Sequence, residues 1–167
     1  MKKGEIKNFR IEDLAHGGDG VARAENGMAV FISLTLPGDL VKAKITKIKK
    51  DYAFAQLIEV IEAGAGRTKA PCPVYNECGG CQLQHINYQK ELKFKQNNIK
   101  QLINRIAEIE DFKLNDVLAA DDDFRYRNKA QFPLEMDEDE QITAGFYKRG
   151  SHDIVPNHNC LIQHPLI

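Results

Sequence analysis

The chain has 167 residues and a mass of 18.9 kDa, which suits one ordinary domain or two small ones. Hydrophobic residues make up 43% and charged residues 28%, a composition that excludes a disordered chain. The formal net charge is -1, so any nucleic-acid partner must be sought in local patches. Neither a signal sequence nor the roughly 18 apolar residues of a membrane helix is present. We therefore expect a cytoplasmic protein without a membrane partner.

Residues 1–62 read as short strands separated by turns. Strands are expected at 4–10, 21–24, 28–32, 40–48 and 52–61. The glycine-dense stretch 16–20, the hairpin-type sequence Glu25-Asn26-Gly27 and the stretch 36–39 supply the turns between them. Short strands at this density favour a small closed five-stranded barrel of the OB type, because closure removes exposed sheet edges.

The remainder of the chain predicts a second, mixed domain. Small residues at 63–70 indicate a linker, and residues 71–85 form a cysteine-containing loop. Apolar residues recur at helical spacing from position 88 to about 109. Strands are expected at 124–134 and 142–147, with acidic residues 137–140 at the exposed tip between them, and an extended piece at 154–162. The predicted class is α+β: a barrel at 1–62, a linker at 63–70, and a small α/β domain at 71–167 with an antiparallel sheet and one long helix. Because the chain stops abruptly, we expect this second domain to be incomplete.

The four cysteines give the sharpest chemical signal: Cys72, Cys78, Cys81 and Cys160. In a reducing compartment such a group indicates a metal or cluster rather than disulfides. Structural zinc usually takes two close cysteine pairs, and only one is present, so the spacing favours an iron–sulfur cluster over zinc or unligated redox thiols. The intervening Gly79 and Gly80 free backbone N–H groups that can hydrogen-bond to sulfur. His85 could replace Cys160 at a zinc ion, but we favour a hydrogen-bonding role for it.

Two groups of residues are candidates for binding the phosphates of a nucleic acid. Alternation along the expected strand 124–134 places one group on a single face: Arg125, Arg127, Lys129 and Gln131. An ordinary solvated face beside the acidic residues 121–123 explains this group equally well. The second group is a lysine-rich strand of the barrel that includes Lys42 and Lys44. OB-like barrels commonly bind oligonucleotides, although solvated lysines on a strand are just as common.

Recognised catalytic motifs are missing from the sequence. It contains no dinucleotide-binding G-x-G-x-x-G, no P-loop, no H-E-x-x-H and no G-x-S-x-G. No pair of carboxylates occurs in a pattern that would form a catalytic cleft. The chain is therefore not expected to hold a complete active site.

The chain resembles the N-terminal portion of the bacterial S-adenosylmethionine-dependent RNA (uracil-5-)-methyltransferases of the 23S ribosomal RNA type. Residues 14–22, with Val30-Phe31 and residues 36–39, resemble the TRAM domain, an OB-like RNA-binding barrel. The run from Cys72-Pro73 through Cys78-Gly79-Gly80-Cys81 to Gln84-His85 resembles the cluster-binding loop of that family. Residues 126–129, 145–147, 151–152 and 160–163 fit its central domain.

The resemblance implies that Cys72, Cys78, Cys81 and Cys160 bind a [4Fe–4S] cluster, with zinc or an empty site as alternatives. It also implies 23S ribosomal RNA as the partner. The family's catalytic domain, which binds S-adenosylmethionine and carries the nucleophilic cysteine and the base, has no counterpart in these residues. We therefore expect the chain to be inactive alone. We also expect it to be monomeric. The competing hypotheses are a small iron–sulfur electron carrier and a zinc-stapled RNA-binding or interaction module.

Overall fold

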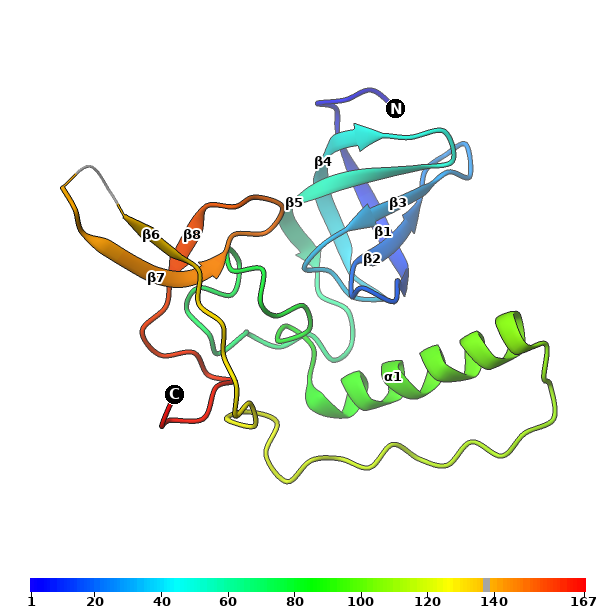
Figure 1. Cartoon of the computed structure of the whole chain (residues 1–167). Helices are drawn as coiled ribbons and strands as arrows, with labels where there is room; N and C mark the ends of the chain where they lie inside the picture. Colours follow the sequence, from blue (N-terminus) through cyan, green and yellow to red (C-terminus); the bar gives the residue numbers. More distant parts are fainter. Residues whose placement is uncertain (137–138) are drawn as a thin grey trace. The chain divides into compact units, whose positions relative to one another are not determined.

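The computed structural model describes residues 1–136 and 139–167 and divides the chain into two compact units (Figure 1). Unit 1 contains residues 1–69 and 85–117, and unit 2 contains residues 70–84 and 118–167. The first segment of unit 1 ends within the expected linker. The long helix, which the sequence analysis assigned to the second domain, belongs to unit 1. No helix in the described residues is long and apolar enough to cross a membrane.

Unit 1 contains the closed barrel that the sequence predicts. Its strands are β1 (Ile6–Leu14), β2 (Gly20–Arg23), β3 (Ala29–Ile32), β4 (Leu40–Ile48) and β5 (Tyr52–Glu62). They close in the order β1-β2-β3-β5-β4. All neighbouring strands are antiparallel except β3 and β5, which run parallel. The predicted five-stranded, OB-like architecture is thus confirmed, with strand ends that differ by a few residues.

Alternate residues of these strands point inward and fill the barrel. Ile11, Val30, Ile32, Val41 and Ile45 are at most 1% exposed. Side chains of this size contribute about 1.5–3 kcal/mol each when they are removed from water. The period of two in the sequence therefore decides which face of each strand is buried.

Residues 64–68, which lie within the predicted flexible linker, are held against the barrel. The carboxylate of Asp39 is completely buried and accepts hydrogen bonds from the backbone N–H groups of Leu36 and Gly64, each at 2.8 Å. The Arg67 guanidinium forms a bidentate ion pair with the same carboxylate and also donates to the Leu34 carbonyl. Burial alone would raise the pKa of Asp39, but the Arg67 and backbone hydrogen bonds outweigh it and hold the pKa below its ordinary value.

The predicted helix is present as α1 (Tyr88–Leu102), followed by the short π-helical turn η1 (Ile103–Ala107). Asn87 caps its start, since the Asn87 side chain accepts from the Lys90 N–H at 2.9 Å. Much of the apolar stripe remains exposed: Ile99 of α1 is 48% exposed and Ile106 of η1 is 77% exposed. The polar side, roughly 180° round the helix, faces the end of the barrel. An amphipathic pattern therefore predicted the helix but not the face that meets the barrel.

Unit 2 contains a three-stranded antiparallel sheet of β6 (Leu134–Met136), β7 (Ile142–Tyr147) and β8 (Ile154–Pro156). The predicted hairpin is confirmed, because Leu134 pairs with Ala144 and Met136 with Ile142. The prediction of a strand over 124–134 is wrong for nearly its whole length. Residue 125 has a left-handed φ of 56° that an extended strand does not allow. The expected acidic tip, residues 137–140, lies partly outside the described residues.

Candidate functional site

All four cysteines line one small cavity of unit 2, of about 50 Å³. The fold thus brings the loop cysteines together with a residue almost 80 positions downstream. The remaining walls are mainly apolar. The lining includes Cys72, Cys78, Cys81, Cys160, Tyr75, Phe146, Leu161, Ile162 and Arg127.

The cysteine loop is held against the end of β7. The Gly79 N–H donates to the Tyr147 carbonyl at 2.8 Å, and a Cβ atom at Gly79 would lie only 3.0 Å from that oxygen. The Arg149 guanidinium donates to the carbonyls of Tyr75 and Cys81 and lies 5.2 Å from the centre of the Tyr75 ring. Backbone and guanidinium contacts therefore fix the loop on the sheet.

A second arginine holds the segment that carries Cys160. The half-buried Arg125 side chain donates to the Cys160 carbonyl at 2.9 Å and to Asn159 Oδ1 at 2.8 Å. The Arg125 N–H also donates to the Leu161 carbonyl at 2.9 Å. The backbone at Arg125 is left-handed, with a φ of 56°. The predicted alternation of Arg125 with Arg127 on one strand face is therefore wrong.

The donors in the cavity suit a sulfur-bound metal group. The four cysteines supply thiols, which bind iron–sulfur clusters and structural zinc, and Gln84 and Asn157 also line the cavity. The Gly80 N–H donates to Cys78 Sγ at 3.3 Å, as the glycines in the loop predict. Burial, followed by the charges of the other three thiols, raises the pKa of Cys81 above its ordinary value, although a Gln84 hydrogen bond opposes this. Within the described residues, no three Cys, His, Asp or Glu side chains are arranged to hold a single metal ion.

His85 belongs to unit 1 and does not line the cysteine cavity. Its side chain is 3% exposed, and its Nε2 atom lies 3.2 Å from the Thr35 carbonyl oxygen. The favoured hydrogen-bonding role is therefore observed. The partner is 50 residues earlier in the chain, which sequence spacing could not indicate.

The predicted RNA-binding residues belong to both units. Lys42 and Lys44 are exposed on β4 of the barrel. Lys129 and Gln131 are exposed in a segment of unit 2 that is not a strand. Arg127 pairs through its backbone with residues 162 and 164 and lines the cysteine cavity. The expected stripe along 125–131 is therefore absent as a strand face.

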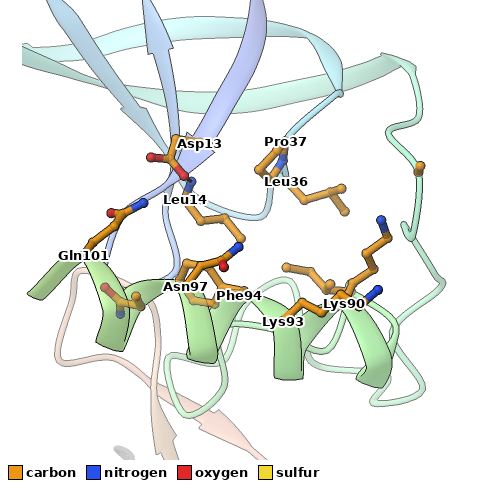
Figure 2. A pocket seen from close by; sticks show the side chains of 12 residues that line it. Asp13, Leu14, Leu36, Pro37, Lys90, Lys93, Phe94, Asn97 and Gln101 are labelled. Atoms are coloured by element: carbon orange, nitrogen blue, oxygen red, sulfur yellow. Dashed lines mark hydrogen bonds between the residues drawn. The ribbon is translucent and has the colours of Figure 1, made fainter. Parts of the chain in front are cut away.

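A groove of about 290 Å³ separates α1 from the end of the barrel within unit 1 (Figure 2). The side chains of Lys90, Lys93, Asn97 and Gln101 border it along α1. The apolar part of the wall consists of Leu14, Leu36, Pro37, Ala65, Ile86 and Phe94. The Asp13 carboxylate lines the same groove, so its rim combines ammonium groups, carboxamides and a carboxylate around an apolar wall and suits a strongly polar group. The sequence does not predict this groove, because its lysines match the solvated polar face of an ordinary amphipathic helix.

Three comparisons relate the chain to known proteins. Residues 1–58 match the family model of the TRAM domain. An uncharacterized RNA methyltransferase of Halalkalibacterium halodurans is 42% identical over 164 residues, covering 98% of this chain and 35% of that protein. An uncharacterized RNA methyltransferase of Staphylococcus aureus (strain COL) is 37% identical over 163 residues, covering 98% and 36%. The chain thus spans about a third of the length of these relatives.

Among solved structures, a similar fold occurs in the Pyrococcus abyssi tRNA (uracil-54, C5)-methyltransferase in complex with S-adenosyl-L-homocysteine. The match has a TM-score of 0.64 and 22% identity, and covers 95% of this chain and 33% of that one. At this identity the likeness concerns the fold. Residues 1–58 therefore form a TRAM domain, and the chain is homologous over nearly its whole length to RNA methyltransferases.

Proposed function

We propose that this chain is the RNA-binding and [4Fe–4S]-binding part of an S-adenosylmethionine-dependent RNA (uracil-5-)-methyltransferase that acts on ribosomal RNA. The observation that carries the proposal is the 37–42% identity, over 97–98% of the chain, to proteins named RNA methyltransferases. The uracil-5 chemistry is supported by the fold shared with a tRNA (uracil-54, C5)-methyltransferase. In this proposal the methyl donor and the catalytic groups belong to a further domain, so the chain alone transfers no methyl group.

The cluster is supported by the convergence of Cys72, Cys78, Cys81 and Cys160 on one mainly apolar cavity. When bound, the cluster would supply a cross-link between the cysteine loop and the Cys160 segment, with no redox step required for methyl transfer. Arg149 holds the cysteine loop and Arg125 holds the Cys160 segment. The thiols are therefore positioned by hydrogen bonds from these two arginines to the backbone. This arrangement suits a structural site.

RNA binding is supported by the TRAM domain and by exposed lysines on its barrel, including Lys42 and Lys44. Neutralising phosphates with such side chains gives an affinity that falls steeply with salt. The chain should therefore bind ribosomal RNA fragments at low salt and lose affinity as salt rises. The measurement is fluorescence anisotropy at several salt concentrations, with transfer RNA as the competing RNA. A preference for transfer RNA would contradict the ribosomal part of the proposal.

The cluster is tested by purifying the chain without oxygen and measuring its visible spectrum, iron, sulfide and zinc. A brown protein with about four irons and four sulfides per chain is expected. Cys81→Ser should lower the iron content, whereas Ser33→Ala, a change on the barrel of unit 1, should leave it unchanged. A colourless protein with one zinc per chain would contradict the cluster, because zinc is d¹⁰ and gives no visible chromophore.

A further inference from the structure

The outer surface of the barrel carries three aromatic side chains in mutual contact, which we call the aromatic face: Phe31, Tyr52 and Phe54. Their ring centroids lie 5.5–5.8 Å apart. Phe31 on β3 lies opposite Phe54 in the parallel pairing of β3 with β5, and Tyr52 precedes Phe54 on the same side of β5. The alternate residues Val30 and Ala53 are fully buried, so the rings point outward.

This placement reverses the usual distribution of aromatic residues. Residues 1–69 contain four aromatic side chains, and Phe9 alone of them belongs to the barrel core. Tyr52 is 37% exposed, and Phe31 and Phe54 are half-buried. Contacts between the rings help to hold β3 beside β5, but branched aliphatic residues would serve that purpose as well. Exposed flat rings offer in addition a surface on which other flat rings can stack.

Positively charged side chains lie beside the aromatic face in the sheet register. Lys47 on β4 lies opposite Phe54 in the sheet register. Arg23 on β2 lies opposite Ala29, which in turn lies opposite Tyr52. Residues 42–54 contain five lysines and one acidic residue, Asp51. The five are Lys42, Lys44, Lys47, Lys49 and Lys50. The rings are therefore bordered by groups that attract a polyanion.

We propose that the aromatic face binds single-stranded RNA by stacking its bases on Tyr52 and Phe54, while the neighbouring lysines contact the phosphates. Stacking is possible for any base, but only where the bases are not already stacked within a double helix. The inference rests on the proposed RNA-binding function. It adds how the barrel binds and which state of the RNA it selects.

The test compares two labelled probes by fluorescence anisotropy with the full 167-residue chain. One probe is an oligouridine of about ten nucleotides, within the usual site size for such barrels, and the other is an abasic ribose–phosphate oligomer of the same length. The variants are Tyr52→Leu, Phe54→Leu and the ring-preserving Tyr52→Phe. Ile58→Ala is the matched control, because Ile58 is a 50% exposed apolar residue on the same strand. Thermal unfolding of each variant checks that it folds.

Wild type should bind oligouridine more tightly than the abasic oligomer. Tyr52→Leu and Phe54→Leu should each weaken oligouridine binding on the order of tenfold and leave abasic binding and the salt dependence unchanged. Tyr52→Phe and Ile58→Ala should bind as wild type does. Equal affinity for the two probes, or ring variants that bind oligouridine normally, would overturn the stacking inference and leave RNA binding intact. Failure to bind either probe at low salt would overturn the proposed RNA-binding function as well.

Discussion

Replacing Arg67 with alanine should strongly destabilise unit 1. The Asp39 carboxylate is completely buried, and the Arg67 side chain is only 18% exposed. Without the guanidinium, the carboxylate keeps two backbone donors but loses its counter-charge. Breaking a buried ion pair from one side costs about 3–5 kcal/mol, which for a unit of this size lowers Tm by more than about 10 °C.

The matched control is Arg10→Ala. Arg10 pairs with Glu62 on the same barrel at 2.7 Å, but both side chains are more than half exposed. Surface pairs of this kind contribute about 0–1 kcal/mol. Urea titrations followed by circular dichroism should therefore separate the two variants by at least about 2 kcal/mol. Equal losses would refute the assignment of Arg67 to a buried ion pair.

The effect of Arg67→Ala should also depend on pH. In wild type the Asp39 pKa is below its ordinary value, so its stabilising contribution is complete above a pH of about 4 and is lost as pH falls through the folded-state pKa. Without Arg67, burial is opposed only by the backbone hydrogen bonds, and the pKa rises. Protonation of Asp39 then removes the uncompensated buried charge from the Arg67→Ala variant. The difference in unfolding free energy between wild type and this variant should therefore shrink between pH 7 and about pH 4. A constant difference would indicate that the loss comes from packing of the arginine stem instead.

Two further substitutions test close contacts. Gly20→Ala should destabilise the barrel by about 1–3 kcal/mol, because its Cβ would lie 1.9 Å from Thr35 Oγ1; Gly17→Ala, which meets nothing within 4 Å, should change the unfolding free energy little. Similar unfolding curves for both would contradict this packing. Arg125→Ala should speed amide hydrogen exchange in residues 159–163 about tenfold or more, because it removes charged hydrogen bonds to the Cys160 segment. Unchanged exchange would show that other contacts hold this segment.

The barrel could be predicted from sequence because each strand carries its own signal. Apolar residues at every second position and glycine-containing turns define the individual strands. The barrel is expected to close because this leaves no edge strand of the sheet unpaired. The segment 124–134 lacked that signal. If this segment were a strand, one face would be entirely polar and the other would mix polar and aromatic residues. Neither face is apolar enough to be buried, so burial does not require an extended backbone here. Tertiary contacts of Arg125 decided its conformation instead.

Long-range polar contacts account for most of what the sequence did not predict. The sequence predicts a turn at Asp39 and a linker around Arg67, yet these residues, 28 positions apart, are joined by a buried ion pair. The convergence of the cysteines could be predicted from sequence, because three of them share one loop and grouped thiols in a reducing compartment indicate a shared metal or cluster site. The aromatic face was within reach of the sequence: Tyr52 and Phe54 alternate with small residues that fill the core.

The parallel pairing of β3 with β5 has a consequence for the order of events during synthesis. The first three strands can form a meander as soon as they leave the ribosome, but they cannot close a barrel. Closure requires β5, and the Asp39 carboxylate gains its Gly64 and Arg67 partners only when the following residues have emerged. Until then the aliphatic faces of the early strands are exposed to other nascent chains. Translation speed over residues 40–69 therefore sets how long this exposure lasts.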